Sequence, residues 1–371
     1  MRALENFRSG PAAPLVLLVA VVAIHGGMAG ALRAAEGPPA PPPEEEVPAA
    51  AEVPDTAGGK LAADQPYGAE LGGVYRQACM SVVTIRAAND VESDLTTGFF
   101  VADDGLIATV YAGESPPDQV SVAYGGQVYE GTMVAYDAKT RLALVRAGEL
   151  RGPPLEVAMS KDVELGALVG IITESIDPLK RLLPGRLAGR EKHFRGRLLP
   201  VTLLRLNLAT GFDPEAFGAP VLTEEGKLAG VLLLEIPGDE ASIYALPSEI
   251  IDKVRENYLA RGKVGYGWIG ITLEEGTTTP RILECREGGP ASAAGLTTGD
   301  VVLALGGKRI EEYQDVVDAS YFLTPGKPVK ITLLRGMRKF ETTLTPVEKP
   351  AEERGGIPSD KRGKKPPANG K

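Results

Sequence analysis

The sequence predicts an all-β double barrel followed by a small α+β domain, and three observations support this fold class. Short apolar runs alternate with turn-forming Asp, Gly and Pro from Val74 to about Val145, and a second series of such runs continues to about Leu246. A helical pattern follows, and between Gly265 and Val347 further strand patterns surround one helix. With 371 residues, the chain is long enough to bury two separate cores.

The N-terminal segment has the pattern of an export signal, in which basic residues precede an apolar run and small residues follow it. Here Arg2 and Arg8 precede the run Leu15 to Ile24, and Ala29-Gly30-Ala31 follows it. The run is shorter than the roughly 20 residues that a membrane-spanning helix needs. We expect residues 1–35 to be a signal peptide and the protein to reach the periplasm or cell envelope, with an uncleaved N-terminal anchor as the alternative.

Two segments are too polar to fold by themselves. Residues 36–66 are dominated by Pro, Ala and Glu, and residues 349–371 by charged residues, Pro and Gly. Such compositions bury too little apolar surface to offset the conformational entropy that folding costs. We therefore expect a disordered linker at 36–66 and a disordered basic tail at 349–371.

Between these segments, the strand patterns divide into two domains at a helix. The first domain, placed at 74–262, contains the runs SVVTI, TGFFV, GLIATVY, RLALVR, ALVGIIT, VTLLRLNL, KLAGVLLLEI and SIYAL. The sequence SEIIDKVRENYLARG then has apolar residues at helical spacing and ends at Gly262. The second domain, placed at 264–348, combines the runs WIGITL, RILEC, VVLAL, VKITLLR and KFETTLTP with a helix near Tyr313 to Phe322.

Composition excludes several classes of function. The formal net charge of -9 argues against a general nucleic-acid-binding surface, because phosphate binding needs an excess of Lys and Arg. The two cysteines, Cys79 and Cys285, fall in different domains, so we expect no disulfide and interpret both as small core residues or free thiols. The sequence has no His/Cys cluster and no phosphate-binding glycine loop, so we expect neither a metal nor a cofactor.

One segment is basic, although the chain as a whole carries a net negative charge. The stretch Lys180 to Arg205 is rich in Lys and Arg and could bind an anionic partner. The simpler interpretation is a solvated loop with exposed strand ends.

From Ser81 to Leu246, the first domain resembles the protease domain of the HtrA/DegP family. The run Thr97 to Thr109, TGFFVADDGLIAT, follows the family pattern G-S-G-F-I-I-x-x-D-G-Y-I-L-T-N-x-H-V closely. Three residues after Thr109, where the family has its catalytic His, stands Ala112. The resemblance implies a trypsin-like fold for this domain.

Two further signatures of the family also match, and in each of them a catalytic residue of the family is replaced. Asp137 to Val145, DAKTRLALV, matches D-x-x-T-D-L-A-V-L, with Arg141 at the catalytic Asp. Phe212 to Val221, FDPEAFGAPV, matches I-N-P-G-N-S-G-G-P-L, with Phe217 at the catalytic Ser and Glu215 at a glycine of the oxyanion hole. The resemblance thus implies a domain without catalytic residues.

A chemical argument that needs no alignment leads to the same expectation. The serine-protease mechanism requires a neutral imidazole as the base and a carboxylate that orients it. The chain has two histidines, His25 in the leader and His193 in the basic segment. A Cys79–His193 pair is an alternative nucleophile and base, but a core cysteine and a surface histidine are the simpler interpretation.

The second domain carries the most specific motif of the chain. Gly289 to Gly307, GPASAAGLTTGDVVLALGG, resembles the signature P-A-x-x-A-G-L-x-x-G-D-V-I-x-x-I-x-G of bacterial PDZ domains. Pro290 can begin a short helix, and Gly295 can take the left-handed conformation that ends it. Gly299-Asp300 can then turn into an apolar strand, so we interpret the motif as a structural corner.

The peptide site of PDZ domains lies before this motif, and YGWIGI at residues 266–271 resembles it. The resemblance implies that Trp268, Ile269, Gly270 and Ile271 bind a peptide C-terminus, through backbone N–H groups and as an added strand. It also implies that the groove for an apolar C-terminal residue is lined by Ile271, Val316 and Ser320. The alternative is an ordinary edge strand, with Trp268 covering the domain junction.

Both resemblances together predict an exported pseudoprotease that binds peptide C-termini or unfolded segments through its PDZ domain. The barrel domain would be an inert or ligand-occupied platform that can also assemble subunits. One rival is an active serine endopeptidase of envelope protein quality control. The other is a regulator that joins active relatives in mixed oligomers.

Overall fold

The structure is a computed structural model that describes residues 68–87, 96–111, 116–174, 180–194, 197–209, 216–235, 243–274 and 278–350. The expected signal peptide, the expected linker at 36–66 and residues 351–371 of the expected tail lie outside these ranges. Within them, no helix combines the length and the apolar character that crossing a membrane requires.

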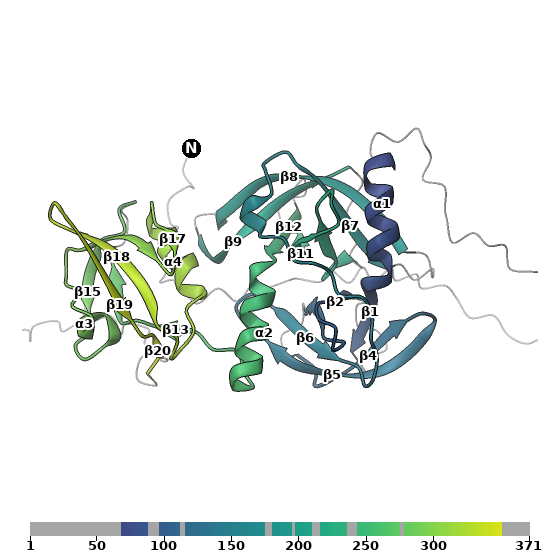
Figure 1. The fold of residues 1–371 in the computed structure, drawn as a ribbon, viewed down its shortest axis with the longest axis horizontal. Helices are drawn as coiled ribbons and strands as arrows, with labels where there is room; N and C mark the ends of the chain where they lie inside the picture. Colours follow the sequence, from purple (N-terminus) through teal and green to yellow (C-terminus); the bar gives the residue numbers. More distant parts are fainter. Residues whose placement is uncertain are drawn as a thin grey trace, which may run out of the picture. The chain divides into compact units, whose positions relative to one another are not determined.

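The first barrel closes in the strand order β1-β2-β3-β6-β5-β4 (Figure 1). Its strands are β1 (Val82–Ala87), β2 (Thr96–Phe100), β3 (Ile107–Val110), β4 (Gln119–Tyr124), β5 (Gln127–Tyr136) and β6 (Leu142–Arg146). Buried Val, Ile and Phe side chains from alternate strand positions form one core, in which Phe100 packs edge-to-face on Tyr124 with ring centroids 5.3 Å apart.

The second barrel closes in the order β10-β11-β12-β9-β8-β7, so the predicted double barrel is confirmed. Its strands are β7 (Leu168–Glu174), β8 (Lys180–Phe194), β9 (Arg197–Leu208), β10 (Pro220–Leu222), β11 (Leu228–Glu235) and β12 (Ile243–Pro247). Strands β8 and β9 stay paired as far as Phe194 and Arg197, whereas the register of β12 with β9 reaches only from Leu206 to Leu204. The outer part of the β8–β9 hairpin therefore extends past β12.

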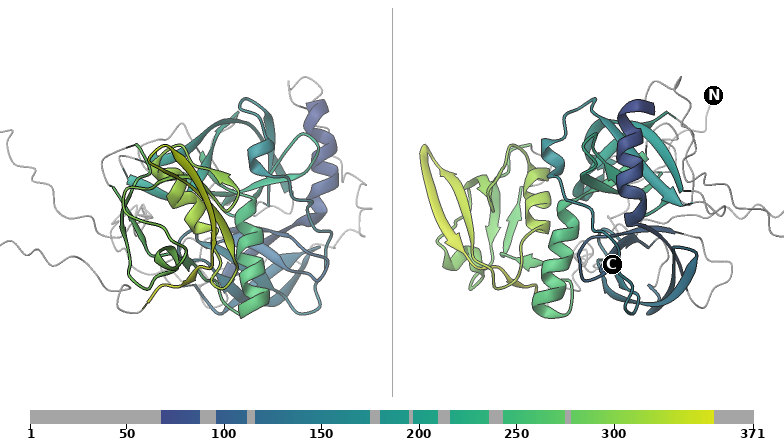
Figure 2. Two further views of the ribbon diagram at one scale, coloured as in Figure 1. Left: turned by 60° about the vertical axis from the view of Figure 1, so that its left-hand side comes forward. Right: turned by 45° about the vertical axis from the view of Figure 1, so that its right-hand side comes forward.

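Two helices accompany the barrels. Helix α1 (Gly68–Ala78) packs against β7, as Figure 2 shows, and buries Leu71, Val74 and Ala78 on one face. The strand-based sequence analysis did not predict α1. Helix α2 (Glu249–Arg261) was predicted, and it ends as expected at Gly262, which has φ +68° and donates its N–H to the Tyr258 carbonyl at 2.8 Å.

The C-terminal domain is the predicted α+β module. It contains β13 (Gly267–Trp268), β14 (Ile271–Leu273), β15 (Ile282–Cys285), α3 (Pro290–Ala293), β16 (Val301–Leu305), β17 (Lys308–Arg309), α4 (Tyr313–Tyr321), β18 (Val329–Arg335), β19 (Arg338–Leu344) and β20 (Val347–Glu348). Strand β14 pairs with β15, β13 with β20, and the remaining strands form a sheet in the order β17-β16-β18-β19. A core separate from those of the barrels includes Ile282, Val302 and Val316.

The motif at residues 289–307 forms the expected corner. Pro290 begins α3, and Gly295 follows it with φ +81°. Asp300 is 1% exposed and accepts hydrogen bonds from the Thr297 N–H at 2.9 Å and from the Arg335 guanidinium at 2.8 and 2.9 Å. The hydrogen bond with Arg335 is the main reason that the pKa of Asp300 lies below its ordinary value. These contacts give Asp300 a structural role.

Candidate functional site

The turn before β10 carries Phe217, the residue that the motif resemblance assigns to the catalytic Ser. Ala216 is buried and Phe217 is half-buried. The Phe217 carbonyl accepts the Thr97 N–H at 2.8 Å, and the Gly218 N–H donates to the Leu232 carbonyl at 2.8 Å. Backbone contacts to both barrels therefore hold this turn.

Gly218 explains how closely this turn approaches the first barrel. Its φ is +76°, and a Cβ at this position would lie 2.2 Å from the Thr97 carbonyl oxygen and 2.5 Å from Thr109 Oγ1. Only glycine combines this left-handed conformation with such an approach to another backbone. Gly218 consequently lies beside the end of β3, at Val110.

Arg141 directly precedes β6 and contacts Tyr111, the residue after β3. The Tyr111 N–H donates to the Arg141 carbonyl at 3.0 Å, and the Arg141 N–H donates to the Asp137 carbonyl at 2.6 Å. Its φ of +64° lies in the left-handed region, which costs a non-glycine residue roughly 1–2 kcal/mol. Ala112 directly follows Tyr111 in the chain, but Ala112 and Glu215 lie outside the described residues.

The side chains around this junction are mainly hydroxyl groups. Thr97 Oγ1 on β2 and Thr173 Oγ1 on β7 lie 3.1 Å apart and join the two barrels. Thr109 Oγ1 donates to the Thr97 carbonyl at 2.8 Å and lies 3.2 Å from Thr96 Oγ1. These bonds satisfy buried hydroxyls, and no imidazole belongs to the described part of the junction.

The suggested cysteine and histidine pair does not form among the described contacts. Cys79 is half-buried, in the turn after α1, and its thiol donates to the Arg76 carbonyl at 3.5 Å. It is therefore not the fully buried core residue of the simpler interpretation. His193 is exposed on β8, as that interpretation expected. Both Cys79 and Cys285 are free thiols.

The basic segment forms part of the second barrel, and the interpretation as a solvated loop is wrong. It comprises β8 and β9, with residues 195 and 196 outside the described ranges. Arg190 donates to the carbonyls of Ser160 and Val163, both at 2.7 Å, and Arg205 pairs with Glu191 at 3.2 Å. Since much of this charge serves local contacts, the segment gives little support for an anionic partner.

The second predicted site is the segment 266–271. Gly270 has φ +77°, its carbonyl accepts the Arg286 N–H at 2.8 Å, and the Ile269 carbonyl accepts the Ala291 N–H at 2.9 Å. A Cβ on Gly270 would lie 3.0 Å from Cη2 of Trp268 and 3.3 Å from Cβ of Arg286. The outer edge of the indole thus packs within this domain, against the loop between β13 and β14.

Strand β14 has the features needed to accept an added strand. Ile271, Thr272 and Leu273 pair with β15 along one edge only. Among the described strands, none pairs with the other edge of β14. A row of unpaired backbone groups of this kind can bind an extended peptide.

The two expected groove residues on α4 differ in exposure. Ser320 is half-buried, whereas Val316 is 3% exposed and belongs to the core of the domain. Ile271, on the facing strand, is partly buried and packs against the same core. In this state the apolar floor of the groove is therefore largely covered. The described residues contain no cluster of His, Cys, Asp and Glu suited to a metal ion.

Sequence comparison with protein families matches both domains. Residues 96–231 match the trypsin-like peptidase domain, and residues 267–345 match the PDZ domain. The chain is 24% identical over 273 residues to a probable periplasmic serine endoprotease DegP-like of Chlamydia trachomatis, an alignment that covers 69% of this chain and 54% of the relative. The DegP-like protein of Ectopseudomonas mendocina is 24% identical over 293 residues, with 73% and 60% covered. The chain thus spans little more than half the length of these relatives.

Solved structures with the same fold include HtrA-type proteases. The protease AlgW with a decapeptide superposes with a TM-score of 0.57 at 17% identity, covering 76% of this chain and 99% of that one. The serine endoprotease from Yersinia pestis superposes with a TM-score of 0.54 at 22% identity, covering 75% and 98%. At these identities the similarity establishes the fold, a trypsin-like double barrel followed by a PDZ domain.

Proposed function

Because the chain is HtrA/DegP-like, with a trypsin-like domain followed by a PDZ domain, we propose that it binds exposed peptide C-termini without cleaving them. The observation that carries the proposal is the junction around the end of β3. The backbone of Phe217 contacts Thr97 there and the backbone of Arg141 contacts Tyr111, and the resemblance of the sequence motifs assigns these two residues to the positions of the nucleophile and the acid. A benzyl group has no nucleophilic atom, and a guanidinium cannot accept a proton at neutral pH or orient a base.

The remaining positions support the same proposal. Ala112 replaces the base, and Glu215 introduces a side chain where a backbone amide of the oxyanion hole is needed. The two histidines of the chain are His25, near its N-terminus, and the exposed His193. An active endopeptidase would need a different catalytic arrangement.

The ligand is argued from the PDZ domain. The free edge of β14 offers backbone hydrogen bonds to an extended peptide, and the left-handed Gly270 shapes the loop at the end of that strand. Backbone N–H groups in such a loop can hold a carboxylate. The ligand that fits is therefore a free C-terminus with an apolar last residue. We expect Ile271, Val316 and Ser320 to line the groove that takes that residue.

The place of action and the partners follow from the leader and the relatives. The export-signal pattern of residues 1–35 and the periplasmic names of the relatives favour the periplasm or cell envelope. Unfolded envelope proteins would expose suitable C-termini there. A regulator of active relatives in mixed oligomers is the second candidate, and co-purification with an active protease would favour it.

The decisive experiment uses Trp268, the sole tryptophan, as a fluorescent reporter. The protein is titrated with a decapeptide ending in Val, with either a free or an amidated C-terminus, and casein digestion is measured in parallel. We expect saturable binding of the free acid only, and no digestion. Digestion that persists in Phe217→Ala after removal of contaminating proteases would refute the proposal.

Two glycine variants make the binding test specific. Gly270→Ala strains the loop and places a methyl group 3.0 Å from the indole, so peptide affinity should fall at least tenfold. Gly295→Ala imposes the same left-handed strain at φ +81°, but with nothing within 4 Å of the new methyl group. It should leave affinity unchanged. Equal losses in both variants would mean that the domain is merely destabilised.

A further inference from the structure

The four-stranded sheet of the C-terminal domain ends in a long edge at β19. All seven residues of β19, Arg338–Leu344, pair with β18, and the register has no shift. The elements that contact β19 most are β18 and α3, both of its own domain. Among the described strands, none pairs with the outer edge of β19. A regular edge of this length can accept another strand.

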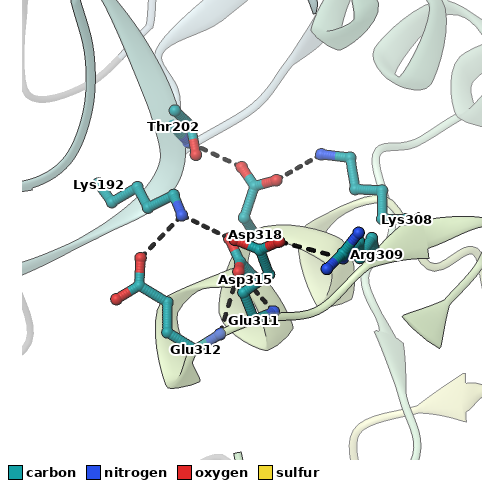
Figure 3. Close-up of polar contacts among 8 residues, drawn as sticks. All are labelled: Lys192, Thr202, Lys308, Arg309, Glu311, Glu312, Asp315 and Asp318. Carbon is teal, nitrogen blue, oxygen red and sulfur yellow. Dashed lines mark hydrogen bonds and ion pairs between the residues drawn. The ribbon is translucent and has the colours of Figure 1, made fainter. Parts of the chain in front are cut away.

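The other edge of the same sheet is much shorter and its side chains are engaged. It is formed by β17, which has two residues, Lys308 and Arg309. Lys308 pairs with Asp318, and Arg309 pairs with Glu311 at 3.0 Å (Figure 3). The same close-up shows Lys192 of β8 against the adjacent helix α4. An added strand would therefore join this sheet at β19.

The turn between β18 and β19 determines which backbone groups of β19 face outward. It has two residues, Gly336 and Met337, and the φ of +59° at Gly336 fits a type II′ hairpin. The two residues that flank such a turn form a hydrogen-bonded pair, and along the ladder hydrogen-bonded and non-hydrogen-bonded pairs alternate. Lys339, Glu341 and Thr343 fall on the non-hydrogen-bonded positions toward β18. Their backbone N–H and C=O groups therefore point outward.

The side chains of Lys339 and Glu341 are available to a partner as well. Both are exposed, and neither forms an ion pair within the part of the chain that the structure describes. The Glu341 carboxylate accepts only a long hydrogen bond, of 3.4 Å, from the Thr332 hydroxyl. Charges on an edge strand oppose pairing wherever they meet like charges. Because these two charges have opposite signs, they also favour any register in which they face each other.

Antiparallel pairing of two copies of β19 allows few registers. In a continuous sheet, residues that lie opposite each other share a face, so one residue at the centre must face its own copy. With Arg338, Lys339 or Glu341 at the centre, like charges lie opposite each other, and with Thr342 no ion pair forms. With Phe340 at the centre, Lys339 of each copy lies opposite Glu341 of the other. Charge complementarity therefore selects the register centred on Phe340.

The apolar side chains of the hairpin fit the same register. Phe340 is partly buried against the core of its domain, and the Arg335 guanidinium lies 4.9 Å from the centroid of its ring. The two Phe340 residues would form a non-hydrogen-bonded pair, in which side chains approach most closely. Met337, 99% exposed at the tip of the hairpin, would come opposite Thr343 of the second copy. The pairing would thus cover an apolar side chain that is otherwise in water.

We propose that two copies of the protein associate through the β19 edges of their PDZ domains, antiparallel and centred on Phe340, so that two four-stranded sheets become one. The inference does not rest on peptide binding. Strand β14, which is expected to accept the peptide, belongs to a different sheet, so this pairing leaves both of its free edges open. Two peptide sites in one assembly bind a partner that presents two C-termini more tightly than separate sites do.

The test is a charge exchange, measured by sedimentation equilibrium of the purified protein. Lys339→Glu and Glu341→Lys each turn two attractive pairs into two repulsive ones, so each should weaken self-association at least about tenfold. The double variant Lys339→Glu/Glu341→Lys restores both pairs and should associate like the wild type. Lys161→Glu is the matched control, since this exposed lysine lies outside the PDZ domain and its reversal changes the net charge as Lys339→Glu does. It should also associate like the wild type.

Amide hydrogen exchange locates the association, which is necessary because the barrel domain could also assemble subunits. In the wild type, exchange at residues 339 and 341 should slow as the protein concentration rises, since their N–H groups become hydrogen-bonded. In Lys339→Glu, exchange in β19 should stay fast at the same concentrations.

The results decide the proposal in either direction. Loss of association in both single variants, with recovery in the double variant, supports the register and excludes unfolding as the cause of the loss. Single variants that associate as the wild type does, or a double variant that does not recover, would overturn the proposal. A wild type that stays monomeric, or exchange in β19 that does not depend on concentration, would overturn it as well.

Discussion

Lys253 should make the stability of the protein rise with pH in the alkaline range. Its amine is buried against the end of α4, and burial lowers its pKa from 10.5 to about 8. At 1.36 kcal/mol per pKa unit, keeping this amine protonated in the folded state costs roughly 3 kcal/mol relative to the unfolded chain. Between pH 8 and 10.5 the unfolded chain binds one proton more at this site, so the free energy of unfolding increases as pH rises.

The assay is urea unfolding of wild type and Lys253→Met at pH 7.5 and pH 10. The free energy of unfolding of the wild type, measured relative to the variant, should increase by about 2 kcal/mol between the two pH values. Lys161→Met is the control, because this side chain is exposed and is not among the charges that act on Lys253, and its stability difference from wild type should change much less between the two pH values. A wild-type-to-Lys253→Met difference that does not change with pH would refute the reasoning.

Three further predictions concern single residues. Gly218→Ala should destabilise the protein by about 3 kcal/mol, from left-handed strain together with the collision with β2; an unchanged Tm in calorimetry would contradict this. Because the folded-state pKa values of Tyr266 and Tyr321 are raised, the two tyrosines contribute to the free energy of unfolding below pH 10, and this contribution decreases as pH rises above 10. As pH rises above 10, Tyr321→Phe should therefore lose less stability than the wild type, as measured by far-UV circular dichroism. The lowered pKa of Asp300 contributes stability above pH 4 that is lost on acidification, so Asp300→Asn should lower the Tm at pH 7 more than at pH 3.

The sequence by itself determined the elements with a strong local pattern. Alternating apolar residues gave the strands of both barrels, and Gly262, Pro290 and Gly295 marked helix ends where the structure has them. The spacing of TGFFV, DAKTRLALV and FDPEAFGAPV also assigned Arg141 and Phe217 to the positions of the acid and the nucleophile, and in the fold the backbone of Arg141 contacts Tyr111 and that of Phe217 contacts Thr97. These features depend on neighbouring residues, which is why sequence patterns reveal them.

Helix α1 and the course of the basic segment were harder to predict. Helix α1 is short and follows a polar stretch, and its buried face is defined by contact with β7. The charges of β8 and β9 suggested a loop, because their partners, such as the Ser160 and Val163 carbonyls, are distant in sequence. Charge alone could not distinguish a solvated segment from a paired strand.

Only the tertiary structure decided how the two domains interact. Asp137 binds Tyr266 and Tyr321, which are 129 and 184 residues away in the sequence, and Lys253 binds a carbonyl 70 residues away. The burial of Val316 likewise depends on how α4 packs into its own domain. Such contacts leave no periodic pattern, because each requires two separately folded surfaces to meet. The sequence therefore predicted the two domains and their candidate sites, and the packing of the folded chain determined that one carboxylate joins them.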